Sequence, residues 1–530
     1  MLLKHKKTRL SRPGNPALLS GWLALFPCGT ATIRTFSSIY NVSKNILFVK
    51  FLQVRGLPST TTRKLLFLKG FTKMLNFVKK NKIMLLFFLS FCISFALRLF
   101  YLDSIPGNIN PDSADTLQRY LQFKYQGGGL FGFNWNGAPA FNTYLIGFTW
   151  DLFGQSVFGL RIASAFISSL AVATTFFLGY LLTKRPLISF LVALSLSCNP
   201  WFLNFSRDGW ENVFNSLFLI LVVTGLYLYV HREKHNIGIV LVTLGSALGF
   251  YGYHPGKFFI LSILLVFTID VFIYKIYTNS KGRIVRPVII VSAFLILTFP
   301  QALSTIEHGD QALGRIKAVS IFNQADPLEE IKNSIWRNIK GFIFFDKTTF
   351  TGYLNARYLP TDHSPINILL LPLFLSGLIV ALKKYPYLLL TFFIVLFLPQ
   401  IFSQTTPDGA RAVHIVPLMY TFILLGIVYA HKIIKNIRMQ SLYRIVIPII
   451  LVVTAYSGVS TYFHWITSSA TLSARRPAVR REDYSSWIYQ LQENIRQGQW
   501  GFNVGQWEIM AQSKTDTLPS QVLPAKTRRK

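Results

Sequence analysis

Long apolar runs alternate with short polar breaks along most of this chain. Each run holds about 18–20 residues, the length that an α-helix needs to cross the hydrocarbon core of a membrane. We therefore predict an all-α polytopic fold with about eleven membrane spans. The predicted spans are residues 83–102, 159–182, 186–203, 213–230, 237–253, 258–277, 287–302, 365–382, 386–402, 413–430 and 445–463.

Two shorter segments break this pattern. Residues 141–153 are apolar but too short to span, so we expect a helix that lies along the membrane surface. Residues 326–340 place apolar side chains at helical spacing and predict an amphipathic helix within a long polar loop.

The two ends of the chain differ from its membrane part, residues 83–463. Residues 1–82 are basic and contain no Asp or Glu. They resemble an organellar transit peptide or form an unstructured extension, and we expect no catalytic role for them in either case. Residues 464–530 are polar, with several Trp and Tyr, and predict a small exoplasmic tail.

The loops between the predicted spans fall into two sets of opposite charge. Short basic loops follow every second span and contain a single carboxylate, Glu233. The alternate loops hold nearly every other Asp and Glu, and Asp270 is the one acid inside a span. Because basic loops stay in the cytoplasm, the acidic loops are expected on the exoplasmic face. The two longest of them, residues 103–158 and 303–364, would form an active-site face there.

Composition excludes several classes of protein. The mean hydropathy is +0.40, and only 14% of the 530 residues are charged, against about a quarter in soluble domains. The net charge of +33 does not indicate nucleic-acid binding, because the basic residues lie between apolar spans. Membrane topology and anionic lipid headgroups account for charge in that position. We expect an integral, multi-pass membrane protein, in the plasma membrane if the source is a prokaryote.

The loop after the first span carries the first acidic residues of the chain. Asp112 and Asp115 stand three positions apart, so a helix starting near Pro111 would place both carboxylates on one face. An acid at a helix N-terminus is also an ordinary capping group, and that interpretation stays open. The catalytic interpretation takes Asp112 as a general base at the membrane surface.

Several motifs of this chain resemble the GT-C glycosyltransferases that use polyprenyl-phosphate sugars, a group that includes protein O-mannosyltransferases and aminoarabinose transferases. Their first exoplasmic loop has a Pro-Gly turn followed by an acid, as at Pro106-Gly107 and Asp112 here. The motifs that carry the rest of the resemblance are Asn136-Gly137, Pro139, Phe153-Gly154, Leu160-Arg161, Ser206-Arg207, Tyr251, Tyr253, Lys257, Arg411 and Pro417.

The resemblance implies a function and a set of roles. The chain would move a sugar from a polyprenyl-phosphate donor to a glycan, lipid or protein acceptor at the exoplasmic face of the bilayer, with inversion. Asp112 would be the base, supported by Asp115 and Glu211. The cations Arg207, Lys257 and Arg411 would bind the donor phosphate, and Tyr253, His254 and Asn136 would contact substrate. Such cations suit a leaving phosphate, because they stabilise its developing charge.

Two further expectations concern cofactors and alternatives. The family's Glu after the catalytic Asp is Ser113 here, which makes a divalent metal doubtful without excluding it; we assign no metal ligands and name no certain cofactor. The alternative function is a polytopic transporter or lipid flippase. That class predicts ionisable residues and broken helices inside the membrane, whereas charge in this chain gathers at the predicted helix ends.

Overall fold

The structure, a computed structural model, describes most of the chain after residue 80. The described residues are 81–127, 129–133, 137–231, 235–274, 282–347, 357–360, 363–404, 406–468 and 479–498. The predicted N-terminal extension lies outside them except for residues 81 and 82. Asn136 and the side chain of Asp270 also lie outside what the structure describes.

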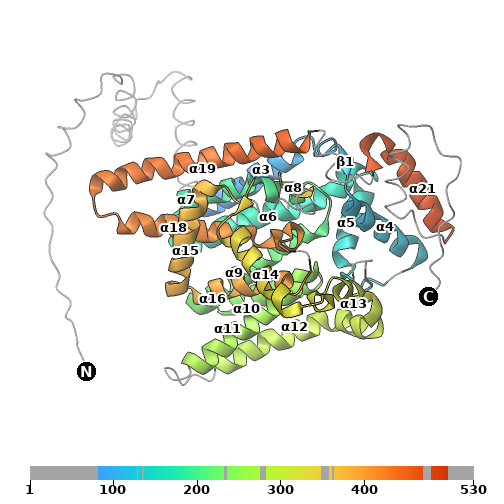
Figure 1. Cartoon of the computed structure of the whole chain (residues 1–530), viewed down its shortest axis with the longest axis horizontal. Coiled ribbons are helices and arrows are strands. Elements are labelled where there is room, and N and C mark those ends of the chain that lie inside the picture. The colour runs from blue at the N-terminus through green and yellow to red at the C-terminus, as the bar shows by residue number, and fades with distance from the viewer. Residues whose placement is uncertain are drawn as a thin grey trace, which may run out of the picture. The chain divides into compact units, whose positions relative to one another are not determined.

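A helix occupies each of the eleven predicted spans (Figure 1). In chain order they are α3 (Lys82–Leu99), α6 (Val157–Thr183), α7 (Pro186–Ser197) with α8 (Pro200–Ser206), α9 (Phe214–His231), α10 (His235–Phe250), α11 (Phe258–Tyr274), α12 (Gly282–Glu307), α15 (Leu371–Lys384), α16 (Pro386–Ile401), α18 (Val416–Ile433) and α19 (Ile437–Ile466).

Not all of these helices are long enough to cross a membrane alone. Within the described residues six are long and apolar enough, or seven if the bent pair α7 and α8 forms one broken span. The chain is therefore an all-α, multi-pass integral membrane protein, as predicted. The number of helices that cross the bilayer completely stays a prediction, because α10 and α16 are apolar but shorter.

The third predicted span is bent rather than continuous. Its two helices, α7 and α8, meet at 66°. Pro200 begins α8, where its missing N–H costs no hydrogen bond, and Asn199 caps the new helix by accepting from the backbone N–H of Phe202 at 2.9 Å. The break turns α8 and the residues after it toward the loop that follows α3.

The core of the bundle lies around three helices. In their most apolar stretches, 72% of α6, 83% of the segment containing α9 and 89% of the segment containing α18 are buried, against 17% of α3 and 22% each of α12 and α19. Gly377 of α15 and Gly426 of α18 let those two helices approach closely. A Cβ at Gly377 would lie 1.8 Å from the carbonyl oxygen of Phe422, so only glycine fits there.

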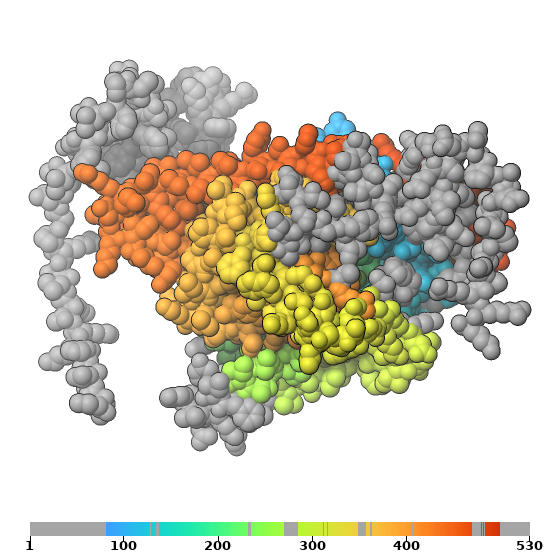
Figure 2. Space-filling model, in the orientation of Figure 1, coloured from blue at the N-terminus to red at the C-terminus, as the bar shows by residue number. Residues whose placement is uncertain are grey.

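Shorter elements follow the ends of the long helices. Both surface helices predicted from the sequence are present, as α5 (Phe141–Leu152) and α14 (Pro327–Asn338). The others are α4 (Pro111–Gln126), η3 (Glu211–Val213), η4 (His254–Lys257), α13 (Gly309–Ala318), η5 (Ile321–Asn323), η6 (Ile339–Ile343), η9 (Ile368–Leu370), α17 (Gly409–Ala412) and η10 (Val413–Ile415). In Figure 2 the yellow surface of α14 and the yellow-green surface of α13 face the viewer.

The described part of the C-terminal tail packs onto the first loop. Strand β2 (Val479–Arg480) pairs antiparallel with β1 (Asn108–Ile109), and η11 (Arg481–Asp483) leads into α21 (Tyr484–Arg496). The hydroxyl of Tyr484 accepts a hydrogen bond from Trp150 Nε1 at 2.6 Å. Figure 1 shows α21 beside α4 and α5. The tail is therefore more structured than its sequence predicts, because its apolar residues are buried against the first loop.

Candidate active site

Helix α4 presents Asp112 from its first turn. Pro111 begins the helix, and the Asn110 side chain caps it by accepting from the backbone N–H of Ser113 at 2.8 Å. The Asn110 amide also donates to the Asp208 carboxylate, and the Ser113 hydroxyl donates to the Asp208 carbonyl. The cap is thus Asn110, which leaves the Asp112 carboxylate available for another role.

Asp112 forms a partly buried ion pair with Arg357. Arg357 Nη2 lies 2.6 Å from Asp112 Oδ2, and the two side chains are 13% and 15% exposed. Burial raises the pKa of Asp112 above its ordinary value, and the nearby carboxylates Asp208 and Asp408 raise it further. Arg357 acts in the opposite direction and lowers the pKa. The geometry therefore describes a carboxylate that is held in place and has a higher proton affinity than an exposed aspartate.

Five of the residues predicted as site residues line one cavity, which we call the Asp112 cavity. Its volume is about 610 Å³. The five are Asp112, Tyr253, His254, Lys257 and Arg411. They come from α4, from η4 and the residue before it, and from α17, so distant parts of the sequence converge there. This convergence is what the catalytic hypothesis requires.

The two cations of the Asp112 cavity that were predicted to bind phosphate differ in their surroundings. Arg411 Nε lies 3.3 Å from Asp408 Oδ2, and both side chains are largely buried. Asp408 is itself held in place, since it caps α17 by accepting from the backbone N–H of Ala410. For Lys257, no carboxylate among the described residues lies within ion-pair distance. Together with Arg357, which pairs with Asp112, the cavity thus contains two paired positive charges and one separately placed, Lys257.

Asp115 and Glu211 lie next to the Asp112 cavity without lining it. Burial, and then the charge of Asp112, raises the pKa of Asp115 to about 8, so this carboxyl is mostly protonated at neutral pH. Glu211 is buried and accepts a hydrogen bond from Thr116 Oγ1 at 2.8 Å. The contact with Thr116 joins Glu211 to α4, which suits a supporting role for Glu211.

Arg207 lies elsewhere and has structural contacts. Its side chain is fully buried, and its guanidinium donates to the carbonyls of Leu97, Arg98, Phe100 and Ile105. It does not line the Asp112 cavity. Arg161 has a similar set of partners, the carbonyls of Leu102 and Asn108. Both arginines fix the turn between α3 and α4, so this geometry favours a positioning role for Arg207 over phosphate binding.

Sequence reasoning missed several residues of the Asp112 cavity. Arg357 and Tyr358 come from the long loop after η6, Asp408 from the loop before α17, and Trp210 from the turn before η3. Asp408 and Trp210 stand three positions from Arg411 and Arg207, two residues that the sequence analysis had singled out. No signal marks Arg357, because it is 245 residues from Asp112 and its loop has no distinctive spacing.

Comparisons with known proteins find likeness only in structure. No protein-family model matches the chain, and no curated protein matches it in sequence. The crystal structure of ArnT from Cupriavidus metallidurans bound to undecaprenyl phosphate is similar over 79% of this chain and 77% of that one, at 12% identity and a TM-score of 0.45.

Two other solved structures are similar at the same level. The Archaeoglobus fulgidus oligosaccharyltransferase matches 71% of this chain and 52% of its own, at 13% identity and a TM-score of 0.48. The arabinofuranosyltransferase AftD from Mycobacteria matches 72% of this chain and 27% of its own, at 13% identity and a TM-score of 0.43. These likenesses concern the path of the backbone and do not bear on the residues of the Asp112 cavity.

Proposed function

We propose that this protein is a membrane glycosyltransferase that moves a sugar from a polyprenyl-phosphate donor to an acceptor on the exoplasmic side. One observation carries the proposal: the Asp112 carboxylate lines the same cavity as Lys257 and Arg411. A base and two cations around one space suit a reaction in which a proton is removed at one end and a phosphate leaves at the other.

The proposed reaction is a single displacement. The acceptor hydroxyl gives its proton to Asp112 while its oxygen bonds to the anomeric carbon, and the bond from that carbon to the phosphate oxygen breaks. The electron pair of that bond leaves with the polyprenyl phosphate, where Lys257 and Arg411 stabilise the added negative charge. One displacement inverts the anomeric configuration. The acceptor is a glycan, a lipid or a protein, and the bilayer holds the donor.

Reconstitution tests the proposal directly. The full chain, purified in lipid nanodiscs, would be given radiolabelled sugars linked to polyprenyl phosphate, with an extract of cell-surface material as acceptor. Transfer of label with release of polyprenyl phosphate is the expected result. Absence of any turnover across a panel of hexose and pentose donors would count against the proposal.

The pH dependence of transfer should report the Asp112–Arg357 pair. Only the ionised carboxylate accepts a proton, so kcat/KM should fall as the pH drops through the raised pKa of Asp112. Arg357 lowers that pKa, and in Arg357→Gln the acidic limb should therefore move to higher pH. Arg337→Gln removes an arginine paired with Glu330 away from this cavity and should leave the limb in place. An acidic limb that stays fixed in Arg357→Gln would contradict this role.

We further propose that the reaction needs no divalent metal. Arg357 already neutralises Asp112, and the hydroxyl of Ser113 is engaged with the Asp208 carbonyl. Among the described residues no group of three or more His, Cys, Asp and Glu side chains could hold a metal ion. Dialysis against EDTA should leave the transfer rate within about twofold of its starting value, since no ligand set is disrupted. Loss of activity that Mg²⁺ or Mn²⁺ restores would refute metal independence.

A lipid transporter is the second candidate, and the broken pair α7 and α8 is the observation that favours it. The break lies near Arg98, a fully buried arginine whose guanidinium donates to Ser94, Ser168 and Ser197. Those contacts hold the arginine in place and suit a structural role. Proteoliposomes with fluorescent polyprenyl-phosphate sugar discriminate the two functions, because a transporter changes the leaflet of the lipid and leaves its glycosidic bond intact.

A further inference from the structure

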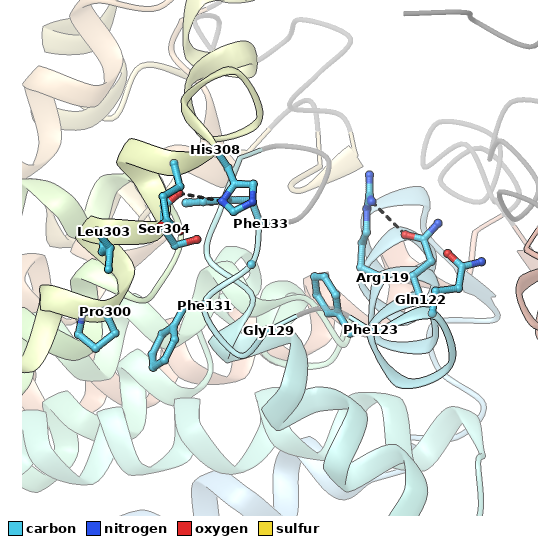
Figure 3. Close-up of a pocket in the computed structure, with 14 residues that line it drawn as sticks. Arg119, Gln122, Phe123, Gly129, Phe131, Phe133, Pro300, Leu303, Ser304 and His308 are labelled. Carbon is cyan, nitrogen blue, oxygen red and sulfur yellow. Dashed lines mark hydrogen bonds between the residues drawn. The ribbon is translucent and has the colours of Figure 1, made fainter.

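A second cavity lies between the later turns of α4 and the end of α12. Its volume is about 550 Å³, and Figure 3 shows its two walls. Arg119, Gln122 and Phe123 come from α4, whereas Ser304 and His308 come from the end of α12 and the position after it. The loop after α4 contributes Phe131 and Phe133 between them. We call this space the Phe123 cavity.

One face of α4 connects the two cavities. Asp112, Asp115, Arg119, Gln122 and Gln126 follow one another at three- or four-residue steps, the spacing of a single helix face. The first of them lines the Asp112 cavity, and the last three line the Phe123 cavity. A helical rise of about 1.5 Å per residue puts Arg119 about 10 Å, and Gln126 about 21 Å, along the axis from Asp112.

The opposite wall is continuous in the same way. Pro300 to His308, at the end of α12, line the Phe123 cavity, and Ile316 of α13 and Val319 line the Asp112 cavity. The two spaces therefore share α4 on one side, and on the other side they are lined by two helices that follow each other in the chain, α12 and α13. A chain-like molecule bound in the Phe123 cavity would extend along α4 toward the Asp112 carboxylate.

Gln122 indicates that the Phe123 cavity is built to bind something. Its side chain is 6% exposed, and its Oε1 accepts a hydrogen bond from Arg119 Nη1 at 2.9 Å. That bond orients the carboxamide, and among the described residues its Nε2 has no hydrogen-bond acceptor. Buried donors are normally satisfied, so a ligand oxygen is the natural partner for this group.

We propose that the Phe123 cavity binds the acceptor and that the acceptor is an oligosaccharide, an inference that rests on the proposed function. Sugar rings carry an apolar C–H face that packs on aromatic rings and hydroxyls that exchange hydrogen bonds with amides, guanidinium groups and carboxylates. The Phe123 cavity offers both kinds of surface: the rings of Phe123, Phe131 and Phe133, and the polar groups of Arg119 and Gln122.

Other ligand chemistries fit the Phe123 cavity less well. A phosphate would meet the carboxylate of Glu307, which lines the same space as Arg119. A lipid tail offers no hydrogen-bond acceptor to Gln122 Nε2, so it would leave that buried donor unsatisfied, which costs free energy. A neutral, hydroxyl-rich chain meets neither penalty.

Direct binding tests this proposal without any need for turnover. Fluorescently labelled full-length protein in nanodiscs, with no donor present, would be applied to an array of short mannose, glucose, galactose and arabinose oligosaccharides. For the tightest binder, Gln122→Leu and Phe123→Leu should each raise the Kd about tenfold, which is the effect of losing one buried hydrogen bond or aromatic contact. In the transfer assay the acceptor KM should rise by a similar factor at unchanged kcat.

Matched controls separate binding from folding. Gln118→Leu changes the same residue type on α4 outside both cavities, and Phe148→Leu changes an exposed phenylalanine on α5. Both should bind like the parent protein. His308→Ala alters an exposed residue of the opposite wall, where folding is not at risk, and should weaken binding as well.

The possible outcomes distinguish this inference from the proposed function. If no oligosaccharide binds, or if Gln122→Leu binds as tightly as Gln118→Leu, the acceptor assignment is wrong even where transfer to a lipid or protein is observed. If oligosaccharides bind in the Phe123 cavity but no donor sugar is ever turned over, the proposed function fails and the binding site stands.

Discussion

Replacement of Asp112 by asparagine should lower kcat for sugar transfer by about 10²–10⁴-fold, the usual contribution of a positioned general base. The asparagine is nearly isosteric and keeps an oxygen that can accept from Arg357, so α4 and its cap at Asn110 should stay in place. What is lost is the capacity to take the proton of the acceptor. The KM for the lipid donor should therefore change little, because the phosphate contacts are assigned to other residues.

Asp103→Asn is the matched control for this experiment. Asp103 lies in the same first loop but forms an exposed ion pair with Arg481, both side chains being about half exposed. Its loss should leave kcat within about twofold, since exposed ion pairs contribute little. Thermal melting first confirms that both variants are folded. Initial rates with labelled donor are then compared, and they test whether Asp112 acts as the base. Full activity in Asp112→Asn would remove the base from the proposed mechanism.

Loss of Lys257 or Arg411, the two cations assigned to the donor phosphate in the Asp112 cavity, should also impair transfer strongly. We expect Arg411→Met and Lys257→Met each to lower kcat/KM for the donor by about 10²–10³-fold, as happens when one group that stabilises developing negative charge is removed. Methionine keeps much of the apolar stem, so packing around the Asp112 cavity changes little. Because both cations would face the same phosphate, the double variant should lose less than the product of the two single effects.

The controls for these variants are an arginine and a lysine that form ion pairs outside the Asp112 cavity. Arg337 pairs with Glu330 on α14, and Lys124 pairs with Asp151 at 2.8 Å. Arg337→Met and Lys124→Met should retain the parent kcat/KM for donors that differ only in the sugar. If Lys257→Met and Arg411→Met show no larger defect than these two, the phosphate is bound elsewhere.

The helices and their approximate limits follow from the sequence. Apolar runs of membrane length and the segregation of acidic and basic loops depend on local composition. They can therefore be recognised without any knowledge of tertiary contacts. The two surface helices α5 and α14 were predicted for the same reason. The bend between α7 and α8 was missed, because a capped proline break does not lower the average apolarity of the segment.

The candidate site residues also differ in how much of their role the sequence could predict. Asp112, Lys257 and Arg411 are polar groups at the ends of apolar runs, and such positions stand out in a sequence. Arg207 stands out equally, yet the structure gives it backbone carbonyls as partners. A sequence shows where an arginine is placed along the chain, but it does not show which acceptors the fold brings to it.

The sequence by itself determined that this is a helical membrane protein, and it singled out an acidic loop and a few cations that deserve a common test. Only the tertiary structure decided that Arg357 pairs with Asp112 and that α4 runs from one cavity into another. The physical reason is range: hydrophobic periodicity acts over neighbouring residues, whereas an ion pair between positions 245 residues apart depends on how the whole bundle packs.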